Sequence, residues 1–427
     1  TALYNEVAET LTDAALAREY WMRQANVLEH LGEIDAAAAA YGKVLSLDPA
    51  DAPALAALEQ LFVRTERWTD LISVFERRID QSVDPDEREQ LYGQMAATYD
   101  VNLGRPEAAV GCWRKVLEID SASAAALSAL DALFTRQRMW SELADNLEAQ
   151  LVLAQDEAAQ IGLMLRLAAL RESEMGQVEV AIEGYREVLD REISNAPALA
   201  ALERLGADSA HELRIADLLE PLYRQTGDFA KLIGAHEVQV RRSDDASRQV
   251  ELLHQIAELH EDAAGDLDSA FTTLARALAA DPASDRTQTQ IDRVARTTGR
   301  FQDLADVYER QALATTDVVL SSTLLTMSAE VHERDIGSVD TAIAHYRRVL
   351  TQDPTNLNAI ESLERLFRQT ERYAELSLTL QRKAEILDEP DDKKHALFQA
   401  AAIEEDVLSK PEAAIAVYNV LLELDPD

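Results

Sequence analysis

The sequence predicts an all-α protein in which antiparallel helical hairpins stack in a line to form a solenoid. A five-residue motif, in most copies an aromatic residue followed by an aliphatic pair, recurs in steps of 72, 72, 89, 72 and 72 residues. The copies, of which the fourth is weaker, are residues 41–45, 113–117, 185–189, 274–278, 346–350 and 418–422. A fixed period of this length is typical of stacked repeats, because one unit cannot bury its apolar face alone. We therefore expect about 24 helices, with two hairpins in each period.

The composition favours helices and excludes a disordered chain. Apolar residues make up 47% of the 427 residues, whereas aromatic residues make up only 5%. The apolar content is largely alanine and leucine, which favour helices, and alanine also lets helices approach closely. A chain of this length exceeds one ordinary core, but repeats escape that limit because each unit contacts only its neighbours.

The residues from 86 to 154 show the expected order of helices within one period. Leu91, Met95 and Tyr99 have helical spacing. Gly104 is suited to ending that helix, and Pro106 is suited to the first position of the next. We expect four helices, over residues 87–103, 106–120, 122–135 and from about 139 to 151.

Recurring small residues mark the turn inside each odd-numbered hairpin. The turn residues are Gly32, Gly104, Gly176, Gly265, Gly337 and, in the sixth copy, Ser409. Five residues after each of them comes an alanine, at Ala37, Ala109, Ala181, Ala270, Ala342 and Ala414. A small side chain at this position lets the two antiparallel helices of a hairpin cross closely.

The even-numbered hairpins have a marker of their own, an aromatic residue with a leucine three residues later. The pairs are Trp68 and Leu71, Trp140 and Leu143, Phe229 and Leu232, Phe301 and Leu304, and Tyr373 and Leu376. Aromatic residues at helical spacing indicate core packing rather than a ligand site.

Residues 18–51 resemble the tetratricopeptide repeat family, whose pattern repeats about every 34 residues. The matching positions are Trp21, Ala25, Leu28, Gly32, Ala37, Tyr41, Val44 and Pro49. The even hairpins match less well, because Glu59, Leu71 and Asp131 stand where the family has small residues. The resemblance covers nearly the whole chain, and it implies a right-handed superhelix in which the first helix of each hairpin lines a concave, protein-binding surface.

We expect one solenoid over residues 1–427. Its parts are a partial hairpin at 1–16, repeat units at about 17–88, 89–160, 161–249, 250–321 and 322–393, and a final hairpin at 394–427. The 89-residue step places 17 extra residues near 206–222, where we expect an added helix capped by Ser209 and kinked or interrupted at Pro221. Both ends cut through the pattern, so we expect a segment of a longer array or a chain whose true ends were removed.

The sequence shows no catalytic, metal-binding or cofactor-binding constellation, so we expect a protein that is not an enzyme. His254 and His260 lie six residues apart, on different helix faces, which does not suit a zinc pair. Cys112 is the one cysteine, which rules out an intrachain disulfide and suggests an ordinary packed thiol.

The charge and hydropathy limit the partners and the compartment. The net charge of −37 disfavours nucleic acid and anionic lipid and favours basic proteins or peptides. Solubility of a long exposed surface explains the charge equally well. No apolar run is long enough to insert into a membrane, and no signal peptide is visible. We expect a bacterial, cytoplasmic protein and leave the periplasm open, because the chain starts without methionine.

By resemblance, polar residues of the first helices would line the binding groove. The candidates are Arg18, Met22, Asn26, Glu29, Gln94, Thr98, Asn102, Arg166, Gln255, Met327, Arg334 and Gln399. Family members that grip a peptide carboxylate use paired Lys and Asn, but Met22 replaces the Lys here, so we do not expect that clamp.

The leading hypothesis is a scaffold that binds a partner protein or peptide along an acidic helical solenoid. One alternative is a self-assembling structural component that associates through the ends of the array. Another is a regulatory or targeting region of a larger protein whose enzymatic domain lies outside these residues.

Overall fold

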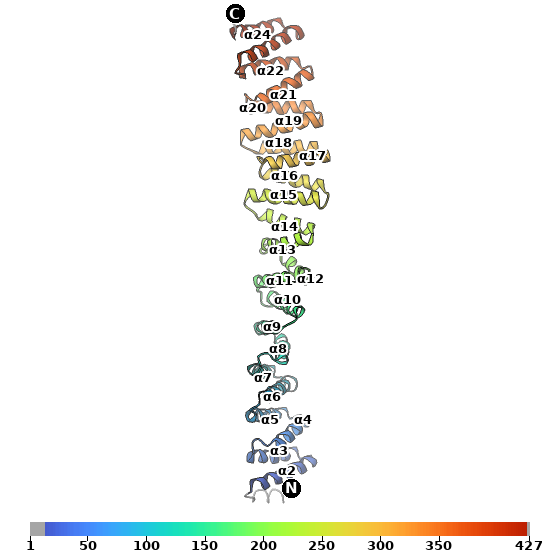
Figure 1. The fold of residues 1–427 in the computed structure, drawn as a ribbon, viewed down its shortest axis with the longest axis vertical. Coiled ribbons are helices and arrows are strands. Elements are labelled where there is room, and N and C mark those ends of the chain that lie inside the picture. The colour runs from blue at the N-terminus through green and yellow to red at the C-terminus, as the bar shows by residue number, and fades with distance from the viewer. Residues whose placement is uncertain (1–12, 425–427) are drawn as a thin grey trace. The chain divides into compact units, whose positions relative to one another are not determined.

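The computed structural model describes residues 13–424, and every regular element among them is helical (Figure 1). These residues form 23 α-helices and three short π-helical turns, which confirms the all-α class. The predicted partial hairpin at 1–16 lies mostly outside the described residues.

Contacts within the chain define two compact units that meet between Leu202 and Glu203. The helices of the first unit are α2 (Ala14–His30), α3 (Ile34–Leu47), α4 (Ala52–Arg64), α5 (Trp68–Gln81), α6 (Pro85–Ala97), α7 (Pro106–Ile119), α8 (Ala124–Gln137), α9 (Trp140–Leu153), α10 (Glu157–Ser173) and α11 (Val178–Arg191), and α12 (Ala196–Leu205) crosses the boundary.

The second unit continues the same series of hairpins. Its helices are α13 (Glu212–Thr226), α14 (Phe229–Arg242), α15 (Ala246–Asp262), α16 (Leu267–Ala280), α17 (Asp285–Thr298), α18 (Phe301–Ala314), α19 (Val318–Val331), α20 (Val339–Gln352), α21 (Leu357–Gln369), α22 (Tyr373–Ile386), α23 (Pro390–Ala402) and α24 (Pro411–Leu424). We call the first helix of each hairpin its A helix and the second its B helix.

Each helix packs mainly against its neighbours along the chain, for example α2 against α3 and α18 against α19. An apolar core from Trp21 to Leu170 lies in the first unit, and one from Ala257 to Val417 lies in the second. Packing between sequence neighbours alone is what a stacked repeat requires.

The four helices expected between residues 86 and 154 are present as α6 to α9. Pro106 occupies the first turn of α7, as predicted, because its missing N–H leaves no helical bond unmade there. The structure also confirms a close crossing at the alanines five residues after each turn: Ala37, Ala109, Ala181, Ala270 and Ala342 are fully buried, and Ala414 is 2% exposed.

The aromatic residue that marks the even hairpins packs against the core in four copies, as predicted. It does not do so in the copy that contains the insert. The partner leucines are all buried, and Trp68, Trp140, Phe301 and Tyr373 pack against the core. Phe229 differs, because its side chain is 44% exposed and borders a cavity.

The glycine at each odd turn adopts a left-handed backbone, with φ between +61° at Gly104 and +78° at Gly32. Ser409 adopts the same conformation, with φ +54°, although a Cβ atom is disfavoured there. The even turns need this conformation too, but three of the five use Glu66, Arg138 or Glu371, so the sequence shows no regular glycine at these turns.

Replacement of Ser409 by glycine is expected to stabilise the α23–α24 hairpin by about 1 kcal/mol, because the left-handed strain disappears. The reverse change, Gly337→Ser, should destabilise the α19–α20 hairpin by a similar amount. Hydrogen exchange of the flanking helices in the full chain measures both effects. Unchanged protection in Ser409→Gly would contradict the prediction.

The insert near 206–222 adds a helix, as expected, but the helix differs in detail. The hairpin at this point contains α12, α13 and α14 instead of two helices. Ser209 does not cap α13, which begins after His211 without a side-chain cap. Pro221 lies inside α13 and does not interrupt it.

Candidate functional site

Ion pairs hold the A helices of neighbouring hairpins side by side within the first unit. Arg18 of α2 pairs with Asp51, the N-cap of α4, whose side chain is 1% exposed. Arg166 of α10 reaches both carboxylate oxygens of Asp131 on α8, each at 2.6 Å. These pairs join α2 to α4 and α8 to α10, and we call the surface formed by the A helices of a unit its A face.

A carboxylate recurs at one position near the end of the A helix in all six odd hairpins. The residues are Glu29, Asp100, Glu172, Glu261, Glu333 and Glu405. In four copies it accepts a hydrogen bond from a B-helix tyrosine, as when Tyr41 Oη donates to Glu29 at 3.0 Å. In four copies it also pairs with an arginine of the next A helix, as Glu29 does with Arg64 at 2.8 Å.

These contacts explain the electrostatics of the position. The Arg293 guanidinium holds the pKa of Glu261 below its usual range, against the opposing effect of partial burial. Burial, with a smaller contribution from Glu29, raises the pKa of Tyr41. The carboxylates thus join hairpins to one another and are already largely neutralised, which leaves few of them free for a ligand.

In the odd hairpins after the first, the segment from the N-cap of the A helix to the turn residue is one residue longer than in α2, as in Asp84 to Gly104 compared with Asp13 to Gly32. Trp21 and Ala25 correspond to Tyr92 and Ala96, which lie 71 residues further on instead of 72. In three hairpins the extra residue forms a π-helical turn before the loop, at Thr98–Asn102, His332–Ile336 and Ile403–Val407. A one-residue insertion is the usual origin of such a turn.

This insertion corrects the register of the predicted groove residues. The equivalent of Arg18 is Glu89, since Glu89 accepts a bond from Ser123 Oγ at 2.9 Å just as Asp51 meets Arg18. Thr98 is buried and donates to the Gln94 carbonyl oxygen at 2.8 Å, so it lies in the core and not on the surface.

Most other predicted groove residues of the first unit lie on the A face, but several are engaged by the protein itself. Asn26 accepts from Tyr41 Oη at 2.6 Å, and Arg18, Glu29 and Arg166 are ion-paired. Met22 is half-buried, and Gln94 and Asn102 are exposed.

The predicted residues of the second unit lie on three different A helices. Arg334 pairs with Glu330, and Gln399 Nε2 lies 2.7 Å from His395 Nε2. Gln255 and Met327 are half-buried, and each of them borders a cavity.

The cavity at Met327 lies between α19 and the turn from α20 to α21, and its volume is about 530 Å³. In the corrected register Ser322 is the equivalent of Arg18 and Asn356 the equivalent of Asp51. The ion pair of Arg18 and Asp51, which joins the first two hairpins, is therefore replaced here by two short polar side chains. The space is bordered by the amides of Gln352 and Asn358 and by the exposed Val318 and Val319.

The cavity at Gln255 has a volume of about 560 Å³ and lies between α13, α14 and α15. Phe229, Leu232 and Leu259 form its apolar part, and Glu258 and Asp262 border it with carboxylates. His236 at its wall is almost completely buried, and its Nε2 lies 3.4 Å from Glu220 Oε1.

The remaining reactive side chains are packed inside the helices. Burial, with a smaller contribution from Glu76, raises the pKa of Cys112 to about 11, which suits the predicted packed thiol. His254 is buried and satisfied, with Nδ1 2.7 Å from Gln290 Oε1 and Nε2 2.9 Å from Thr287 Oγ1. Within residues 13–424, no three His, Cys, Asp or Glu side chains are placed to hold a metal ion. No described helix has both the length and the apolar character to cross a membrane.

Comparisons with solved structures return helical repeat proteins of low identity. The structure of Naa15/Naa10 bound to HypK-THB is 12% identical, covers 96% of this chain and 68% of that chain, and has a TM-score of 0.28. YrrB, described as a TPR protein with an unusual peptide-binding site, is 18% identical over 47% of this chain and 97% of its own, with a TM-score of 0.26. A tetratricopeptide repeat protein from Parabacteroides merdae is 12% identical over 65% of this chain and 98% of its own, with a TM-score of 0.26.

Family models give the more direct assignment. A search of curated proteins found no match to the sequence. Two tetratricopeptide repeat models match adjacent parts of the chain, at residues 18–51 and 54–89. The first match coincides with the hairpin in which the pattern of Trp21, Gly32 and Pro49 was recognised. The chain is therefore an all-α protein in which residues 18–51 and 54–89 match tetratricopeptide repeat models.

Proposed function

We propose that this chain is a scaffold that holds an extended segment of a partner protein against the A-helix face of its second unit. Tetratricopeptide repeat proteins typically mediate protein–protein interactions and are usually not catalysts. The observation that supports a site here is the cavity at Met327, where Ser322 and Asn356 stand in place of an ion pair.

The lining of this cavity suits a peptide backbone. Asn358 presents a side-chain amide, which can both donate and accept hydrogen bonds, whereas the Gln352 amide already bonds to Ser321 and Ser322. Val318, Val319 and Met327 add apolar surface for a side chain of the partner. The net charge of −37 favours a partner with basic residues outside the cavity, because such a charge speeds the approach of cations.

The test is a variant in which the cavity is filled with the side chains that form the ion pair between the first two hairpins. In Ser322→Arg/Asn356→Asp, the ion pair of Arg18 and Asp51 is rebuilt at the equivalent place. The N-cap of α21 is preserved, since Asp51 caps α4 as Asn356 caps α21. Fold and melting temperature should therefore change little.

Peptides selected from a random phage-displayed library on the full chain serve as the probe. Binding of the peptides that recognise the A face should weaken by about ten-fold or more in the filled variant, because the polar contacts of a whole side chain are lost. Leu378→Asp, an exposed position on α22, is the matched control and should bind them normally. If no selected peptide loses affinity on filling, the proposed site is wrong.

A further inference from the structure

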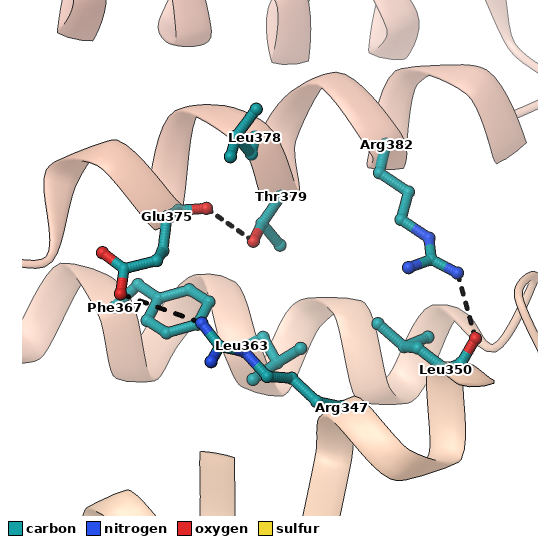
Figure 2. A pocket seen from close by; sticks show the side chains of 8 residues that line it. All are labelled: Arg347, Leu350, Leu363, Phe367, Glu375, Leu378, Thr379 and Arg382. Carbon is teal, nitrogen blue, oxygen red and sulfur yellow. Dashed lines mark hydrogen bonds and ion pairs between the residues drawn. The ribbon is translucent and has the colours of Figure 1, made fainter. Parts of the chain in front are cut away.

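A third cavity lies on the B-helix face of the second unit, between α20, α21 and α22 (Figure 2). Its volume is about 330 Å³. Leu363 and Phe367 form its floor and are 3% and 2% exposed, whereas Leu378 at its rim is 65% exposed. A large exposed leucine beside a buried apolar floor is a place where a partner side chain could be desolvated.

Two guanidinium groups flank this apolar floor. Arg382 extends from α22 to the end of α20, where its Nη2 donates to the carbonyl oxygens of Leu350 at 3.1 Å and Pro354 at 3.2 Å. Arg347 leans in from α20, with its guanidinium carbon 5.4 Å from the ring centre of Phe367 (Figure 2).

The positive charge at this cavity is poorly compensated. Glu375 is the one lining carboxylate, and it lies 3.8 Å from Arg347, which is long for an ion pair. No carboxylate among residues 13–424 forms an ion pair with Arg382. In a chain with a net charge of −37, where most described arginines are paired, two arginines with a single distant carboxylate are unusual.

The internal repeat shows that this combination occurs once. The position of Arg347 is Gly42, Arg114, Arg186 and Ala275 in the copies at α3, α7, α11 and α16, and the position of Arg382 is Arg77, Ala149, Val238 and Arg310 on α5, α9, α14 and α18. In none of these copies are both arginines present. The position of Leu378 is Ser73, Asp145, Gly234 and Asp306, so that no other copy has a large apolar residue there.

We infer that the cavity between α20, α21 and α22 is a second docking site, which takes an acidic–apolar segment of a partner protein. In such a segment an aspartate or glutamate lies next to a leucine, isoleucine or phenylalanine. The carboxylate binds to Arg382, because a guanidinium that bonds to backbone carbonyls through one nitrogen still has N–H groups to donate, and Arg347 adds positive charge on the other side of the floor. The apolar side chain covers Leu363 and packs beside Leu378.

This site shares α20 and α21 with the A-face site, but its lining residues and the charge of its ligand differ. The overall negative charge of the chain slows the approach of an acidic segment, so binding should be measured near 0.15 M salt, where charges beyond about 8 Å are screened. The two sites can then be tested independently in one molecule.

The experiment selects random phage-displayed peptides on the full chain and measures the affinity of synthetic copies of the enriched sequences. Peptides with the acidic–apolar pattern should be among those enriched. Leu378→Asp introduces the residue that two other copies have at this position, so the variant is expected to fold. Its affinity for these peptides should be lower by about ten-fold or more. Arg382→Gln, which can still donate a hydrogen bond to the carbonyl oxygens at the end of α20, should lower the affinity for these peptides by a similar factor.

Two controls separate this inference from the proposed function. The peptides should bind the Ser322→Arg/Asn356→Asp variant normally, and replacing their Asp or Glu by Asn or Gln should abolish binding. An absence of acidic–apolar sequences, or binding that is unchanged in Leu378→Asp, overturns the inference. Loss of binding in the filled variant alone also overturns it, and assigns those peptides to the A face.

Discussion

Replacement of Ala342 by leucine is expected to destabilise the second unit by about 2–3 kcal/mol. Ala342 is fully buried at the start of α20, where this helix crosses α19. A larger side chain has no space at this position, so the helices must separate or the side chain must leave its preferred rotamer. Urea unfolding and hydrogen exchange of α19 and α20 measure the loss.

Ala344→Leu is the matched control for this prediction. Ala344 lies two residues further along the same helix and is exposed. The change adds the same atoms and has the same effect on helix propensity, but it should alter stability by no more than about 0.5 kcal/mol. Equal effects of the two substitutions would show that close helix crossing does not account for the recurring alanine.

The recurring alanines illustrate why the fold could be predicted from the sequence. In each odd hairpin two helices cross closely at the same position, so a small residue recurs there, at Ala37, Ala109 and their later equivalents. Local stop signals such as Gly104 and Pro106 then place the helix ends. These features act within one hairpin, and no long-range contact had to be known.

The binding surface was harder to predict, because one extra residue inside a helix changes which side chains face outward. The π-helical turn at Thr98–Asn102 leaves the spacing of Gly104 and Ala109 unchanged but shifts every residue before it. A strict 72-residue register therefore places Thr98 on the surface, whereas its side chain is buried. The structure reveals this change of register, because Glu89 contacts Ser123 in the same way that Arg18 contacts Asp51.

The cavities depend on differences in side-chain volume between copies, which can be interpreted only in the correct register. Ser322 marks a cavity because its equivalent, Arg18, is long and ion-paired. Leu378 marks another because its equivalents are shorter or acidic. We therefore propose binding sites where the sequence departs from the repeat, whereas agreement with the repeat indicates packing.

Lowering the pH from about 7.5 to 5.5 is expected to destabilise the second unit and to leave the first unit almost unchanged. Four histidines of the second unit are buried, and burial is the main cause that lowers the pKa of each. They are His236, His254, His332 and His345. His30, the one histidine among the described residues of the first unit, is exposed.

Nearby charges modify the effect of burial but do not reverse it. Glu220 faces His236, and Asp306 and Glu309 of α18 face His332, with Glu309 also 3.7 Å from His345. The rings of His332 and His345 meet edge to face at 5.3 Å, so a proton on one disfavours a proton on the other. The cations Arg224 and Arg248 near His236, Arg286 near His254 and Arg348 near His345 act in the same direction as burial.

The sign of the pH effect follows from these lowered pKa values. Below about pH 6.5 the unfolded chain binds protons at these histidines that the folded chain does not bind. The free energy of unfolding of the second unit should therefore be greatest above pH 6.5 and fall as the pH drops through the lowered values. Each pKa unit of difference contributes about 1.4 kcal/mol, and four groups act on the same unit. The carboxylates whose pKa is lowered, such as Glu261, respond only in more acidic solution.

Hydrogen exchange of the full chain at the two pH values, corrected for the intrinsic exchange rate, measures both units in one sample. The double variant His332→Leu/His345→Phe should show a smaller loss of protection in α18 to α20 than the wild type, because two titrating groups are absent. His395→Gln, an exposed position in the same unit, should show the full loss. If the protection of the second unit is the same at pH 5.5 and pH 7.5, the buried histidines do not control its stability.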